Sequence, residues 1–383
     1  MTPVPRVAVL GAGAAGAAAA RTLAARDDVR LTVFTPAGEG PLIRTLLPSV
    51  AFGPLAPELV AIGLPQTEIV ADAAVRVDGE RREIELSSGR TLTADAIVVA
   101  TGSTARELPP DLPGRDHALA SGRLYTLHGI ADAVRIRDLL SRHPDGADVA
   151  LLGGGAIAAE TASTLHRAGH RVTLIARSDV PGRAAFGDEI AELLARVHRE
   201  RVRTLLGRIL VRLDADVESV ILTLDDGTTV RADLVLAALG SVPSAPSPWT
   251  DGVDVDAGLR TPYPGVYAAG GVARHHDDLP GPWRIDHWEE SAAQGAHAAR
   301  AVLADLGRGE DPGPYRPRSP FTAMVHGLAV SGAGLLSSPG TRDAGDAFVI
   351  RHLQGGRLIG LGAVDAVGAV FAAAPTLHEE PER

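Results

Sequence analysis

The chain has 383 residues, enough for two to three domains, and its 45% apolar and 22% charged residues are typical of a folded globular protein. A formal net charge of −10 argues against general binding to nucleic acid or to anionic membranes, because both depend on clustered positive charge. The sequence has no cysteine and no lysine, which excludes a redox disulfide, a thiolate nucleophile, a thiolate-bound metal and lysine Schiff-base chemistry.

No stretch of the sequence approaches the roughly 18 consecutive apolar residues that span a membrane. The apolar segment 7–20 carries glycines in a phosphate-loop pattern and is followed directly by Arg21, so we interpret it as folded protein rather than as a secretion signal. The sequence therefore predicts a cytoplasmic protein.

The first predicted element is a short buried strand at residues 6–10. It leads into Gly11-Ala-Gly13-Ala-Ala-Gly16 and then into an alanine-rich helix that ends near residue 25. In this strand–turn–helix context the G-x-G-x-x-G pattern predicts a dinucleotide site. Gly11 permits the tight turn, Gly13 lets the backbone approach a pyrophosphate, and Gly16 lets the helix pack on the strand. The alternative is a helix start that binds no ligand.

A second copy of this pattern begins at residue 148. Residues 149–152 predict a strand, G-G-G-A-I-A at 153–158 forms the turn, and a helix runs to Gly169, which is suited to end it. Residues 171–176 predict the next strand. Alanine in place of the third glycine is compatible with the dinucleotide pattern.

The repeat extends beyond the two glycine turns. Residues 86–102 and 224–240 share a Gly, an Asp and a final Gly at the same spacing, with a buried strand pattern between the Asp and the final Gly in each. Two such halves predict two dinucleotides in one chain, and hence electron transfer between them. Chance similarity between two stretches rich in alanine and glycine is the alternative.

This arrangement resembles the two-dinucleotide-binding flavoprotein reductases of the pyridine nucleotide–disulfide oxidoreductase superfamily. Within that superfamily it is most similar to the ferredoxin and rubredoxin reductases that serve oxygenases. The resemblance rests on the two glycine loops and on A-T-G at 100–102, A-L-G-S-V-P at 238–243, P-G-V-Y-A-A-G at 264–270 and R-I-D-H-W-E-E-S-A-A-Q-G at 284–295.

The resemblance implies an α/β fold with two Rossmann-like dinucleotide-binding domains and a small α+β C-terminal interface domain. The FAD-type domain is expected at 1–119 and 242–314, the inserted NAD(P)-type domain at 120–241, and the C-terminal domain at 315–383. Apart from the resemblance, residues 348–351 and 357–361 predict strands joined by a turn at 354–356.

The activity that the resemblance implies is an FAD-dependent NAD(P)H oxidoreductase, with a ferredoxin-like protein or a small molecule as electron acceptor. No nucleic-acid, membrane or metal partner is expected, and a homodimer is compatible with it. Glu160 and Trp288 are the predicted catalytic residues. The predicted cofactor-binding residues are Gly11, Gly13, Gly16, Arg44, Ala100, Thr101, Gly102, Gly153, Gly155, Ala156, Ile157, Glu160, Arg177, Gly240, Gly270, Gly271, His287 and Trp288.

Several positions depart from the family pattern on the FAD side. No acid follows the strand at 31–34, no lysine follows Arg44, and Gly271 stands where the family carries an aspartate that accepts from the ribityl chain. These losses predict weakened FAD binding, because each lost hydrogen bond costs about 1 kcal/mol. A Gly271→Asp substitution is predicted to tighten it.

The nicotinamide side departs in another way. An acid that accepts from the ribose 2′-hydroxyl selects NAD, but Arg177 follows the strand at 171–176 instead. A guanidinium pairs with the 2′-phosphate, so the sequence predicts NADP in preference to NAD.

Two other functions stay open on the sequence. One is a degenerate paralogue with weakened or lost FAD binding that acts as a nucleotide-binding or partner subunit. The other is a specialised biosynthetic redox enzyme with an altered flavin pocket. The run His275-His276-Asp277-Asp278 is consecutive rather than spaced for one face, so we predict no metal site there.

Overall fold

The computed structural model describes residues 3–38, 40–277, 279, 281–337, 339–343 and 347–379. By its internal packing the chain divides into two compact units. The first comprises Met1–Thr45, Glu58–Thr104 and Ser241–Ser319, and the second comprises Leu46–Pro57, Ala105–Gly240 and Pro320–Arg383.

The first unit is built on a parallel five-stranded sheet in the order β19-β7-β1-β2-β3. Its strands are β1 (Arg6–Leu10), β2 (Arg30–Thr35), β3 (Glu68–Ala71), β7 (Ala96–Val99) and β19 (Val266–Ala268). The side chains at 7–10 and 96–99 are buried throughout, as apolar runs in the middle of a two-sided parallel sheet should be. The predicted first strand is confirmed.

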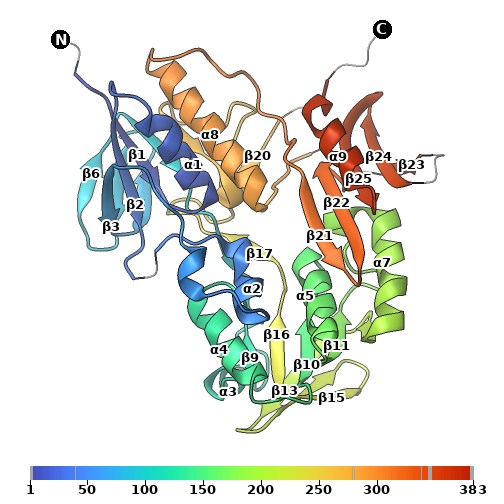
Figure 1. Cartoon of the computed structure of the whole chain (residues 1–383). Helices are drawn as coiled ribbons and strands as arrows, with labels where there is room; N and C mark the ends of the chain where they lie inside the picture. Colours follow the sequence, from blue (N-terminus) through green and yellow to red (C-terminus); the bar gives the residue numbers. More distant parts are fainter. Residues whose placement is uncertain are drawn as a thin grey trace. The chain divides into compact units, whose positions relative to one another are not determined.

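Helices α1 (Ala14–Ala24) and α8 (Trp288–Asp305) lie side by side in this unit (Figure 1). Their close approach depends on Gly295, because a Cβ there would lie 2.0 Å from the carbonyl oxygen of Ala15. Helix α8 therefore approaches α1 this closely at residue 295 because glycine has no side chain.

The rest of the first unit consists of short elements. They are the antiparallel strands β4 (Ala74–Asp78), β5 (Glu83–Leu86) and β6 (Thr91–Thr93), the pairs β8 (Ser103–Ala105) with β17 (Ser241–Pro243) and β18 (Val253–Val255) with β20 (Ala273–His275), and the 3-10 turns η1 (Arg44–Leu46), η2 (Pro57–Val60) and η3 (Gly270–Val272).

The second unit repeats the plan with the parallel order β12-β11-β10-β16-β9. Its strands are β9 (Leu124–Tyr125), β10 (Asp148–Leu152), β11 (Arg171–Ala176), β12 (Arg203–Leu206) and β16 (Leu234–Ala237), with an antiparallel sheet of β13 (Leu210–Ala215), β14 (Val220–Leu224) and β15 (Thr229–Ala232). Its helices are α2 (Leu47–Ala51), α3 (Arg115–Ala120), α4 (Ile130–Leu140), α5 (Ala156–Arg167), α6 (Arg183–Phe186) and α7 (Asp188–Arg201).

The internal repeat predicted from the sequence is confirmed by matching hydrogen bonds. Asp95 Oδ2 accepts from the amide of Arg6 at 2.7 Å, and Asp233 Oδ2 accepts from the amide of Asp148 at 2.8 Å. Each aspartate therefore fixes the start of the strand that leads into a glycine turn. The predicted α/β class with two Rossmann-like halves follows from this topology.

The C-terminal segment forms an antiparallel sheet in the order β21-β22-β25-β24-β23. Its elements are β21 (Phe321–Val325), β22 (Leu328–Gly334), β23 (Gly340–Arg342), β24 (Phe348–Gln354), β25 (Arg357–Val364), α9 (Val367–Ala373) and η4 (Ala374–Thr376). The two predicted strands and their turn are confirmed. The edge strand β21 runs beside α5 (Figure 1), so the sheet packs within the second unit. The three-domain division by residue number stays a prediction.

None of the helices in the described part of the chain combines the length and the apolar character that a membrane span requires.

Candidate dinucleotide-binding sites

The first glycine turn is packed tightly on one side and open on the other. Gly11 has φ +105°, and a Cβ there would lie 2.2 Å from the carbonyl oxygen of Ala100; a Cβ at Gly16 would lie 1.9 Å from that of Gly11. Gly13 has φ −67°, which any residue adopts, and no atom lies within 4 Å of its Cβ position. Gly13 therefore leaves free the space that a pyrophosphate approaching the α1 amino end would fill.

The second glycine turn has the same construction. Gly153 has φ +136°, and a Cβ there would lie 2.1 Å from the carbonyl oxygen of Ala238, whereas nothing lies within 4 Å of a Cβ at Gly155. Ala156 opens α5, and the side chain of Ile157 on its first turn is 60% exposed although apolar. The turn thus presents an open cradle with an uncovered apolar side chain beside it.

The end of β7 offers a polar atom that lacks a partner. Thr101 Oγ1 is buried and makes no hydrogen bond to another described residue, which is uncommon for a buried hydroxyl. The neighbouring Gly102 has φ +72°, and Arg44 Nη1 reaches the carbonyl of Ser103 at 3.4 Å. An open cradle, an unpaired hydroxyl and a nearby guanidinium fit a dinucleotide such as FAD. Gly240, with φ +88°, occupies the corresponding place after β16.

Gly270 and Gly271 follow β19 in the first unit. The amide of Gly270 donates to Gln294 Oε1 on α8 at 2.8 Å, which fixes this turn to the helix. A Cβ at Gly271 would lie only 2.3 Å from Asp286 Oδ1. The geometry argues against the predicted gain from Gly271→Asp as a single substitution, because the new side chain would begin within contact distance of the carboxylate of Asp286.

His287 and Trp288 stand at the amino end of α8, where His287 is the N-cap residue and Trp288 the first helical residue. Both side chains are half-buried. Burial lowers the pKa of His287, although the carboxylates of Glu289 and Asp286 act in the opposite direction. His287 Nδ1 lies 3.4 Å from Glu289 Oε2. The imidazole therefore has an acidic partner on the first turn of α8.

Glu160 lies on α5, in the second unit, whereas Trp288 belongs to the first. Glu160 Oε1 accepts a hydrogen bond from the amide of Met324 in β21 at 3.0 Å. Burial raises the pKa of Glu160, and the bond from Met324 partly offsets this. The carboxyl is thus oriented by the C-terminal sheet, a contact that the sequence did not predict.

Arg177 follows β11 directly, at the same sheet edge as the second glycine turn, where the amide of Gly153 donates to the carbonyl of Ile175 at 2.9 Å. Its side chain is exposed, and no salt bridge or hydrogen bond joins it to another described residue. Arg177 therefore presents an uncompensated positive charge beside the expected nucleotide.

The residues of the histidine-rich run serve the packing of the first unit. The ring of His275 is buried and stacks on Trp283 with centroids 3.6 Å apart, while His276 Nε2 lies 2.8 Å from Asp254. Asp277 accepts from Trp283 Nε1 at 3.2 Å, and Asp278 lies outside the described residues. Within the described ranges no group of three or more His, Asp or Glu side chains is arranged to hold a metal ion.

Asp286 is the residue at this site that the sequence interpretation missed. It belongs to the R-I-D-H-W segment, but only its neighbours His287 and Trp288 were singled out. The available signal was the combination of a missing acid at Gly271 with an acid in this segment, which is close in space only in the folded chain.

Comparisons with known proteins agree with this architecture. A family model described as pyridine nucleotide-disulphide oxidoreductase matches residues 5–295. A relative from Pseudomonas putida, the ferredoxin–NAD(+) reductase component of the p-cumate 2,3-dioxygenase system, is 27% identical over 382 residues, which cover 95% of this chain and 90% of the relative.

Two solved structures show the same fold. One is the covalent putidaredoxin reductase–putidaredoxin complex, with a TM-score of 0.81, 24% identity and coverage of 97% of this chain and 92% of that one. The other is the ferredoxin reductase for the CYP199A2 system from Rhodopseudomonas palustris, with a TM-score of 0.81, 23% identity and coverage of 96% and 93%.

Proposed function

The chain belongs to the pyridine nucleotide-disulphide oxidoreductase family, whose cofactors are FAD and NAD(P)H, and from that premise we propose that it is an FAD-dependent NAD(P)H reductase that delivers electrons to a ferredoxin-like protein. The observation that supports this best is the pair of glycine turns, each with an open cradle at Gly13 or Gly155. Because the chain has no cysteine, a disulfide on this chain cannot be the next electron acceptor.

In this proposal the first unit holds FAD and the second holds the nicotinamide nucleotide. The chemistry that FAD would supply when bound is acceptance of a hydride from the nicotinamide and transfer of electrons to the acceptor. The amides at Gly13 and the amino end of α1 would hold the FAD pyrophosphate, and the buried hydroxyl of Thr101 would be available to hydrogen-bond the cofactor. His287 and Trp288 shape the flavin side, and Glu160 serves the nicotinamide side.

The ferredoxin-like acceptor is inferred from the relatives. The Pseudomonas putida relative is the reductase of a dioxygenase system, and the solved complex joins a reductase to putidaredoxin. The same relatives favour an active reductase over a degenerate paralogue. We also propose a cytoplasmic location, on the cysteine-free composition, and the homodimer as the assembly to test by light scattering.

The purified protein should be yellow, with flavin bands at roughly 370 and 450 nm that bleach when NADPH is added without oxygen. Addition of two or more equivalents of a two-iron ferredoxin, each of which accepts one electron, should restore the flavin bands while the ferredoxin becomes reduced. A colourless protein that takes up no added FAD would contradict the proposed function and support the paralogue. A flavoprotein that reduces only small molecules would contradict the ferredoxin-like acceptor.

Arg177→Ala should weaken NADPH binding about ten- to hundredfold, because it removes a charge-assisted hydrogen bond to the 2′-phosphate. NADH binding should change little, since NADH lacks that phosphate. Isothermal titration of both nucleotides measures the effect.

The matched control for Arg177 is Arg171→Ala. This exposed arginine begins the same strand at its opposite end and is paired with Asp148 at 2.7 Å. The control removes an equal charge and should leave both nucleotide affinities within about twofold. Equal NADPH and NADH affinities in the parent protein would refute the NADP assignment.

A further inference from the structure

The carboxylate of Asp286 is held in one orientation by three donors. Its Oδ2 accepts from Ser103 Oγ at 2.6 Å, from Arg284 Nη2 at 2.9 Å and from Ser241 Oγ. Arg284 is itself fixed, because its Nε donates to the carbonyl of Gly271 at 2.6 Å and its Nη2 to Ser241 Oγ at 2.9 Å. All five residues belong to the first unit.

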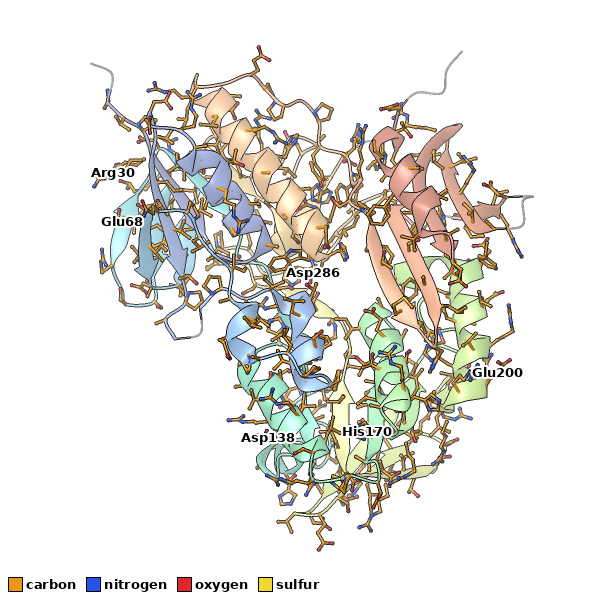
Figure 2. The ribbon with its side chains drawn as sticks, viewed as in Figure 1. Arg30, Glu68, Asp138, His170, Glu200 and Asp286 are labelled. Atoms are coloured by element: carbon orange, nitrogen blue, oxygen red, sulfur yellow. The ribbon has the colours of Figure 1, made fainter. Side chains whose placement is uncertain are left out.

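The second oxygen of this carboxylate is unused by the protein. Asp286 Oδ1 makes no hydrogen bond to another described residue, and the side chain is 29% exposed. This oxygen lies over the Cα of Gly271, 2.3 Å from the position that a Cβ would take there. Asp286 comes just before the start of α8, where Figure 2 labels it.

A carboxylate is an acceptor with about four lone-pair sites, and three donors already occupy Oδ2. Oδ1 is therefore an oriented, half-sheltered acceptor that suits a hydroxyl or N–H donor of a ligand. It lies at the edge where β19 ends and α8 begins, which is the edge of a parallel sheet where ligands bind. Oδ1 also occupies the space that the side chain of an aspartate at position 271, as in the family pattern, would take.

We propose that Asp286 is the acidic acceptor of the first dinucleotide site and binds a ribityl hydroxyl of FAD. The acid missing at Gly271 is thus supplied from another segment, and glycine is required at 271 because Asp286 fills its side-chain space. The proposal rests on the proposed function, since it requires that this unit binds FAD. It also assigns Ser103, Ser241 and Arg284 the role of positioning residues for the carboxylate.

The proposal is tested by titrating flavin-free protein with FAD and following flavin fluorescence, for the parent chain and for four variants. Asp286→Asn keeps the shape of the side chain, and Asp286→Ala frees the space over Gly271. The double variant Gly271→Asp with Asp286→Ala removes the carboxylate at position 286 and introduces one at position 271, where it can enter the space that Asp286 leaves. Asp27→Ala is the control, because it removes an exposed carboxylate of the same unit from just beyond the carboxyl end of α1.

We expect Asp286→Asn and Asp286→Ala to raise the Kd for FAD about ten- to hundredfold, and Asp27→Ala to change it less than threefold. The double variant should recover at least tenfold of the affinity lost in Asp286→Ala. Gly271→Asp alone should lower the melting temperature and bind FAD no better than the parent chain. NADPH titration and melting curves report whether each variant is folded.

Folded Asp286 variants that bind FAD as tightly as the parent chain would overturn the proposal. Loss of affinity in both single variants without recovery in the double variant would also overturn it, because the carboxylate would then act only by holding Arg284 and the serines. If Asp286→Ala fails to fold, the FAD affinities of Asp286→Asn and of the double variant test the proposal. A parent chain that takes up no FAD overturns the proposed function instead.

Discussion

Gly155→Val should abolish NADPH binding, raising its Kd more than a hundredfold, and leave the fold and FAD binding intact. The backbone of Gly155 is extended at φ −88°, and no atom lies within 4 Å of the new Cβ, so the protein does not obstruct this atom. The branched side chain would instead fill the space where the backbone meets a pyrophosphate. Valine is a poorer N-cap than glycine, which costs about 1 kcal/mol.

Gly153→Val provides the contrast two residues earlier. Gly153 has φ +136°, and its Cβ would lie 2.1 Å from the carbonyl oxygen of Ala238, so this variant should lose several degrees of melting temperature or fail to fold. Melting curves and NADPH titrations of both variants measure the difference. A Gly155→Val protein that binds NADPH like the parent chain would show that the second turn binds no nucleotide.

Acidification from pH 7 to pH 5 should lower the free energy of unfolding by several kcal/mol. Burial lowers the pKa of His198, His297 and His326 to about 4 and that of His275 to about 3. In the unfolded chain these imidazoles titrate near 6.5, so below that pH the unfolded state binds more protons than the folded state. The stability that they contribute is complete above pH 6.5 and is lost as the pH falls toward 4. Each fully buried imidazole contributes about 2 kcal/mol to the loss between pH 7 and pH 5.

The pair of His198 and His326 allows a direct test. His326 Nε2 lies 3.0 Å from His198 Nδ1, and the ring of His166 lies near His326 at a centroid distance of 5.8 Å. Urea unfolding at pH 7 and pH 5 should show a smaller pH effect for His326→Asn than for the parent chain. His117→Asn, at an exposed position, is the control and should leave the pH effect unchanged. An equal pH effect in all three proteins would refute this account.

The parts of the fold that depend on local pattern were predictable from the sequence. The apolar run before Gly153, the glycines of the turn and Gly169 each act on neighbouring residues, so the strand, helix and next strand at 148–176 are where the sequence places them. The repeated Asp95 and Asp233 were predictable because both halves conserve the spacing between strand and hairpin.

The parts of the site that depend on long-range contact were not predictable. Asp286 is joined to Ser103 across 183 residues of sequence, and nothing local shows that its carboxylate fills the space over Gly271. For this reason the sequence could not show that Gly271→Asp would bring two carboxylates together. Likewise, the bond between Glu160 and Met324 spans 164 residues, so the helix pattern predicted the position of Glu160 but not its partner.

The contact between α5 and β21 also affects whether a strand of another copy of the chain can pair with the edge of this sheet. β21 is the outer strand of its sheet, and outer strands offer free N–H groups to which a strand of another molecule can add. Here side chains of α5 accept from two amides: Met324 in β21 donates to Glu160 at 3.0 Å, and His326, in the turn that follows the strand, donates to Ser163 Oγ at 2.7 Å. The carboxylate that we assign to the nicotinamide side thus also occupies an edge amide of β21 to which a strand of another molecule could otherwise add.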